Sequence, residues 1–158
     1  MDQATKENPI TEKTLMEFLT QALDERNVAY MLDKDSFISI PTKIDDHVLN
    51  FIVRAVASGK NPYISIATSP LIDLLNVDDS ARENLYRLLL SLNSYAPLRF
   101  LLTPFEQVIA ATELDVLSWQ DLERRFLARL SFFFDTLNDL LPRVMKLIEK
   151  TRRKGGLT

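Results

Sequence analysis

The feature that most constrains the fold is a long amphipathic segment near the C-terminus, which predicts a helix over residues 118–150. At 100° per residue, its large apolar side chains fall in one stripe. The stripe comprises Trp119, Leu122, Phe126, Leu130, Phe133, Leu137, Leu140, Val144 and Ile148, with Leu127, Phe134 and Met145 on its shoulder. Fully burying one such side chain is worth about 1.5–3 kcal/mol. The rest of the chain must therefore supply a surface that covers this stripe.

Pro142 interrupts the predicted helix, because proline removes one helical hydrogen bond and clashes with the preceding turn. We expect a kink or a break there, followed by a short basic amphipathic segment and a tail. From residue 143 onward the chain has six basic residues and one acidic residue, a net charge of +5, so the preceding part carries −8 of the total of −3. The basic residues are Arg143, Lys146, Lys150, Arg152, Arg153 and Lys154.

Composition indicates one ordinary globular domain. The chain has 158 residues, of which 46% are hydrophobic and 26% are charged. This length and this hydrophobic fraction are sufficient to form a hydrophobic core. It contains no cysteine, which excludes disulfides and cysteine-ligated zinc. The N-terminus shows no basic-then-apolar signal pattern, and no apolar run approaches the ~18 residues of a membrane span. We therefore expect a cytoplasmic protein.

The remaining apolar patterns predict an order of helix, three strands, helix, two strands and helix. Short turns join the strands, so we expect an antiparallel sheet packed by helices, in a single α+β domain. The first helix begins near Thr11 and stops near Asn27, and the second opens at a capping box over residues 80–83. The last helix is capped by Ser118, with Asp121 in place of the usual glutamate. The strands are expected at 37–40 (ending at Pro41), 48–57, 63–68, 98–103 and 107–113, whereas 71–77 fits a strand or a helical turn.

The sequence offers little support for an active site. Its only histidine, His47, stands beside Asp45 and Asp46, which suits half a metal site or, more simply, a loop that enters a strand. With three glycines, two of them in the tail, the chain cannot build a phosphate-binding loop. We expect no enzymatic activity, no cofactor and no metal.

Partner binding is better supported, first by the strand at residues 48–57. Leu49, Phe51, Val53 and Ala55 form its core face, and the opposite face is only half polar. Val48, Ile52 and Val56 lie on that opposite face, with Leu101 or Ile109 as possible neighbours. Two interpretations remain open. A helix covers this face, or the face is exposed and suits a dimer or an extended peptide.

Two further features of the C-terminal helix could contact a partner. Phe132 falls about 130° from the centre of the apolar stripe, among cationic residues that include Arg129, and is either a partner anchor or a single exposed aromatic residue. The basic segment could contact an anionic membrane or nucleic acid, but basic residues also suit a helix C-terminus. The partner-binding candidates are Val48, Ile52, Val56, Leu101, Arg129 and Phe132.

Three stretches carry a resemblance to known families. Residues 88–93 (LLLSLN) end a Leu-rich helix in an asparagine, residues 100–102 (FLL) begin a strand hairpin, and residues 118–122 (SWQDL) open the last helix. This order resembles the YbjN family and the related class I type III secretion chaperones. The match covers about residues 11–141, with residues 1–10 as a flexible arm and residues 142–158 as a basic amphipathic extension and tail.

The resemblance implies an α+β domain, often dimeric, that binds proteins or peptides and catalyses no reaction. Secretion chaperones hold extended segments of client proteins, and YbjN-like proteins are linked to regulation. We therefore predict a chaperone- or adaptor-like protein that binds a peptide or protein client. The alternative is a regulatory or scaffold protein whose basic C-terminal segment contacts an anionic membrane or nucleic acid.

Overall fold

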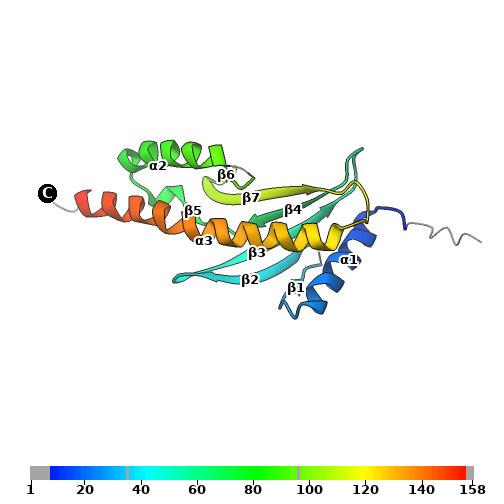
Figure 1. The fold of residues 1–158 in the computed structure, drawn as a ribbon. Coiled ribbons are helices and arrows are strands. Elements are labelled where there is room, and N and C mark those ends of the chain that lie inside the picture. The colour runs from blue at the N-terminus through cyan, green and yellow to red at the C-terminus, as the bar shows by residue number, and fades with distance from the viewer. Residues whose placement is uncertain (1–7, 35, 96, 156–158) are drawn as a thin grey trace, which may run out of the picture.

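A seven-stranded antiparallel sheet forms the centre of the computed structural model, which describes residues 8–34, 36–95 and 97–155. Figure 1 shows the long helix α3 lying along the sheet, with α2 beside its C-terminal half and α1 near its N-terminal end. In chain order the elements are α1 (Glu12–Glu25), β1 (Met31–Leu32), β2 (Ile38–Ile44), β3 (His47–Val56), β4 (Tyr63–Thr68), β5 (Ile72–Asp73), η1 (Leu74–Asn76), α2 (Asp79–Leu92), η2 (Asn93–Tyr95), β6 (Arg99–Leu102), β7 (Gln107–Asp115) and α3 (Leu122–Gly155).

The predicted fold class is confirmed, with a sheet slightly larger than expected. The five predicted strands are present as β2, β3, β4, β6 and β7, and two strands of two residues each, β1 and β5, add to them. Strands β1, β2, β3, β4 and β7 pair in that order, and every pairing is antiparallel. Strand β6 pairs with β7 on the edge opposite β4, since Ala111 has both Ala67 and Arg99 as partners.

One face of the sheet and the stripe of α3 form the core. On β3, Leu49, Phe51 and Val53 are buried, and the ring of Phe51 meets that of Phe133 edge-on with centroids 5.0 Å apart. All residues of the predicted stripe are buried except Trp119 and Leu130, which are partly exposed. Helix α1 adds Leu15, Leu19, Ala22 and Leu23 to the same core.

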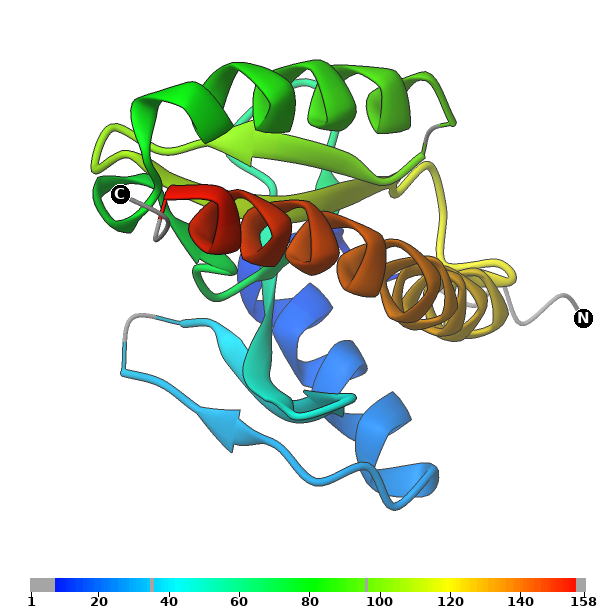
Figure 2. The same ribbon diagram turned by 90° about the vertical axis from the view of Figure 1, so that its left-hand side faces the viewer.

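Helix α3 is continuous across Pro142, so the predicted break is absent. Figure 2 looks along the first half of α3, whereas its second half turns across the view, so the helix is bent. Val144 and Ile148, which follow the proline, are buried in the main core. The proposed division of the chain at residue 142 remains a prediction, but the segment after it packs in cis through these two side chains.

Three predicted element boundaries differ from the structure. Helix α3 starts at Leu122 rather than at Ser118, because Asp121 has a positive φ of 57°. Ser80 lies inside α2, whose N-cap is Asp78. Pro41 lies within β2 rather than at its end. Strand β1 pairs only with Ile38 and Ser39, so Pro41 occupies an open stretch of edge where no donor is needed.

The predicted start of α1 is confirmed. Thr11 is its N-cap. The Thr14 amide donates a hydrogen bond to the Thr11 hydroxyl, and the Thr11 amide donates one to the Thr14 hydroxyl, which together form a capping box. Most of the predicted N-terminal arm, residues 1–7, lies outside the described residues.

Candidate partner-binding surface

The second face of the sheet has no helix packed on it. We call it the open face and define it by β3 residues Val48, Ile52 and Val56, by Ala67 of β4, by Ile109 and Ala111 of β7, and by Leu101 of β6. Val48 is 80% exposed and Leu101 46% exposed, and the others are partly buried by their neighbours in the sheet. Figure 2 shows α1 and α3 together on the other side of the strands. Of the two interpretations of the half-apolar face, the structure supports the exposed one.

Strand register places Ile52 at the centre of a row of small side chains. Ile52 lies between Ser39 and Ala67, and Ala67 lies next to Ala111. Leu101 pairs with Ile109 in the adjoining part of the face. Because its flanking side chains are short, Ile52 stands above them and is available to a partner.

The open face is not a continuous apolar row along β3. Asn50 and Arg54 alternate with the three apolar residues, and Val48 lies at the far end beside the β2–β3 turn. The guanidinium of Arg54 stacks over the ring of Phe37 at 5.2 Å, so this cation belongs to a local pair. Ile52 and Val56 are therefore the parts of β3 best placed to contact one segment.

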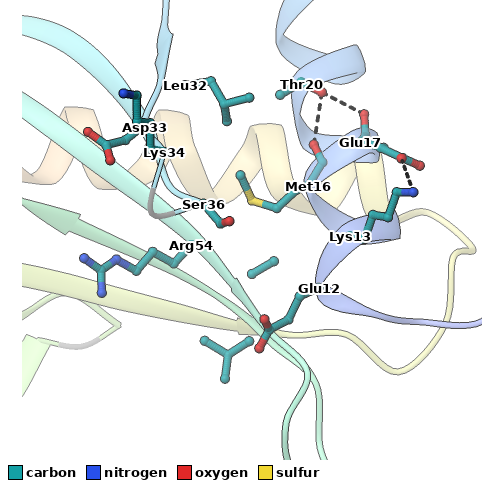
Figure 3. A pocket seen from close by; sticks show the side chains of 12 residues that line it. Glu12, Lys13, Met16, Glu17, Thr20, Leu32, Asp33, Lys34, Ser36 and Arg54 are labelled. Atoms are coloured by element: carbon teal, nitrogen blue, oxygen red, sulfur yellow. Dashed lines mark hydrogen bonds and ion pairs between the residues drawn. The ribbon is translucent and has the colours of Figure 1, made fainter.

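Val56 also lines a hollow of about 660 Å³ between α1, the β1–β2 turn and the end of β3. Figure 3 shows Met16 and Glu12 extending from α1 toward the strands, opposite Leu32 and Arg54. Acidic and basic side chains line the pocket in similar number, and Lys13 pairs with Glu17 at 4.0 Å. The charges of the lining therefore balance, and its apolar part comes from Met16, Leu32, Ala55 and Val56.

Arg129 and Phe132 lie apart from Ile52, at the side of the sheet where β6 begins. The Nη1 atom of Arg129 donates to Thr112 Oγ1 at 3.1 Å and to the Glu113 carbonyl at 2.9 Å. Arg129 and Leu101 also line one notch of about 500 Å³. Phe132, one turn further along α3, is 45% exposed. The structure thus brings Leu101 and Arg129 together and leaves Phe132 accessible.

The basic C-terminal segment exposes positively charged side chains, whereas its apolar side chains pack against the core. Arg143, Lys146 and Lys150 are exposed, and Arg143 pairs with Asp139 of the preceding turn at 3.5 Å. Val144 and Ile148, between them, are buried. Arg152, Arg153 and Lys154 continue the helix, but their side chains lie outside the described residues.

The exposed apolar residues of β1 were not predicted from the sequence. Met31 and Leu32 are 60% and 62% exposed at the outer edge of the sheet, next to the α1 pocket. A strand of two residues has no detectable alternation, so no periodic signal could have identified it.

The residues considered for metal or acid–base chemistry are His47 and the neighbouring Asp45 and Asp46. His47 is exposed where β3 begins, after the β2–β3 turn. Within the described ranges, no three histidine, cysteine or acidic side chains gather as metal ligands. The pKa of Tyr30 is raised, first by desolvation on burial and then by a hydrogen bond and charge repulsion from Asp24. That pair lies beside the end of α1.

Together these features define a secretion-chaperone-like α+β fold. It is similar to a chain in the crystal structure of the ExsC–ExsE complex, with a TM-score of 0.58 and 14% identity, covering 84% of this chain and 97% of that one. It is also similar to an uncharacterized protein from Methanothermobacter thermautotrophicus, with a TM-score of 0.51 and 18% identity, covering 86% and 97%. No protein-family model and no curated protein match the sequence.

At these identities the likeness concerns the fold alone, and the resemblance to the YbjN family stays a prediction. Among the described residues, none of the helices combines the length and the apolar character needed to cross a membrane.

Proposed function

We propose that this chain is a non-enzymatic, chaperone- or adaptor-like protein that binds an extended segment of a partner protein. The observation that carries the proposal is the open face, a sheet surface without a helix whose centre is Ile52. Sheet surfaces of this kind suit extended peptides, which contribute apolar side chains to contacts on the face and backbone groups to pairing at an edge. The residues assigned to partner contact are Val48, Ile52, Val56, Leu101, Arg129 and Phe132.

The likeness to a chain from the ExsC–ExsE complex supports this proposal, because that chain was crystallised in a complex. The exposed apolar side chains give further support. Burying apolar surface yields about 25 cal/mol per Å², so several half-exposed side chains can supply useful affinity. A second copy of this chain is another partner that the open face could accept.

Site-specific photocrosslinking tests the proposal directly. A benzophenone amino acid is placed at Ile52, and a matched one at Leu117, which is 79% exposed in the loop before α3. In cells that naturally produce the protein, we expect discrete crosslinked proteins from position 52 and few from position 117. Equal crosslinking at the two positions, or none at position 52, would contradict the proposal.

The alternative function, contact with a membrane or nucleic acid through the basic C-terminal segment, has less support. Its exposed cations suit a polyanion, but the buried Val144 and Ile148 leave it no apolar face for a membrane. Binding through these cations would weaken steeply as salt rises, whereas contact through the open face would not.

A further inference from the structure

The last residues of β7 form a second unpaired edge of the sheet, distinct from the outer edge of β1. Strand β6 reaches β7 only as far as the pair Arg99–Ala111. Residues 112–115 continue beyond it and pair with β4 alone. Beyond this pair lies a notch whose lining includes Pro97, Arg99, Leu101, Glu113, Asp115 and Arg129.

The outer side of β6, in contrast, is closed by a side chain. The Asn93 amide donates to the Phe100 carbonyl at 3.0 Å and accepts from the Phe100 amide at 2.7 Å. Asn93 thus replaces a neighbouring strand at that position. An incoming strand would therefore meet fewer occupied groups at the end of β7 than at Phe100.

Arginines from α3 occupy the carbonyls of the β7 edge. Arg129 donates to the Glu113 carbonyl at 2.9 Å, and Arg125 Nη2 donates to the Asp115 carbonyl at 3.0 Å. Val116 donates to Pro62 on the β4 side, so by the alternation of an antiparallel ladder the groups of residues 113 and 115 point to the free edge. Among the described residues, the backbone amides of Glu113 and Asp115 have no acceptor.

At residues 113 and 115 the main chain of this edge therefore offers free N–H donors, whereas its carbonyls already accept from arginines. Two backbone N–H groups are open, and each guanidinium has five N–H donors, most of them still unused. Arg125 and Arg129 also form no ion pair with any carboxylate among the described residues. The natural complement of such a surface is an acceptor that carries negative charge.

The carboxylates at the notch lie on the opposite face of the sheet from these arginines. Glu113 and Asp115 share the face of Ala111, which is the open face, whereas Arg125 and Arg129 approach from α3 on the core side. Arg99 is on the open face with the two carboxylates and offsets part of their charge. An extended segment along this edge would thus meet positive charge on its α3 side.

We propose that the end of β7 binds an extended segment of the partner protein whose aspartate or glutamate faces α3. Backbone carbonyls of the segment accept from the amides of Glu113 and Asp115, and its carboxylate accepts from Arg125 and Arg129. Charge-assisted hydrogen bonds of this kind are short and strong. The inference rests on the proposed function and names a chemical preference of the partner, namely an acidic side chain at alternate positions.

The test uses three capped pentapeptides, Val-Glu-Val-Glu-Val, Val-Gln-Val-Gln-Val and Val-Lys-Val-Lys-Val, titrated into the ¹⁵N-labelled full chain and followed by amide shifts in NMR spectra. We expect the glutamate peptide to move the Glu113 and Asp115 amide signals and to bind about tenfold more tightly than the glutamine peptide. The lysine peptide should not bind this edge. Affinity for the glutamate peptide should fall as salt rises.

Variants assign the effect to the arginines. Arg129→Gln and Arg125→Gln should each weaken binding of the glutamate peptide by about tenfold. If Arg129→Gln does not fold, Arg125→Gln, which is the milder change, still provides the test. Arg143→Gln is the matched control, an exposed arginine further along α3, and should leave the affinity unchanged.

Equal affinity for the glutamate and glutamine peptides, or shifts confined to the amides around Ile52, would overturn this inference. Neither result touches the proposed function, which the crosslinking at position 52 decides separately. Crosslinks at position 52 without peptide binding at β7 would leave a partner held by the open face alone.

Discussion

Two adjacent phenylalanines on α3 differ in burial and therefore in the role that each can have. Phe133 is fully buried against Phe51, whereas Phe132 is 45% exposed. The helical period alone separates them, and the sequence therefore predicted their different environments correctly. The hydrogen bonds of Arg129 to β7 were not predictable, because they depend on which strand passes beneath its turn.

Substituting these two residues separates core from surface. Phe133→Ala should lower the free energy of unfolding by about 3–5 kcal/mol, since it leaves a cavity in the core. Phe132→Ala should cost about 1 kcal/mol or less, because its ring is already partly in water. Urea denaturation of both variants measures the difference. Equal destabilisation would show that Phe132 is a core residue and would remove it from the proposed contact surface.

At the scale of elements, long periodic segments were predictable and short or terminal ones were not. The stripe of α3 spans many turns, so its pattern survives local exceptions. The predicted start of α3 was wrong because residues 118–121, which include residue types common at helix caps, form a turn in which Asp121 has a positive φ. Strands β1 and β5 have two residues each and exist only because a neighbouring strand pairs with them.

The burial of residues after Pro142 gives a prediction about this element. Ile148→Ala should lower the free energy of unfolding by about 2 kcal/mol, because the side chain is 6% exposed within the core. Lys150→Ala, two residues further on and exposed, is the control and should change it by less than about 0.5 kcal/mol. Thermal or urea unfolding tests this. A neutral Ile148→Ala would mean that the helix beyond Pro142 contributes little to the domain.

At the scale of the whole molecule, the distribution of helices over the sheet determines what the protein can bind. The pattern of β3 identified both of its faces, but a half-apolar face is compatible with a covering helix or with water. Choosing between them requires knowing where α1 and α3 pack, which depends on contacts between segments far apart in the chain. Both helices use the face of Phe51, so Ile52 and its neighbours are left open.

The candidate site was therefore predictable in part. Ile52, Val56 and Leu101 were assigned correctly to one sheet face, since strand alternation fixes it once the register is set. The pocket beside α1 and the donor-rich end of β7 were missed. Each combines residues from elements that the sequence does not link, such as Met16 with Leu32 and Arg125 with Asp115.

The most direct test of the central claim is quantitative capture of partner proteins on the immobilised chain at low and high salt, with Ile52→Glu and Leu117→Glu compared with the unmodified chain. We expect a small set of proteins that persists at high salt, disappears with Ile52→Glu and is retained with Leu117→Glu, the same change at a more exposed position outside the open face. Folding of each variant is checked by circular dichroism. Capture that is indifferent to Ile52→Glu and lost at high salt would contradict binding through the open face and favour the basic C-terminal segment.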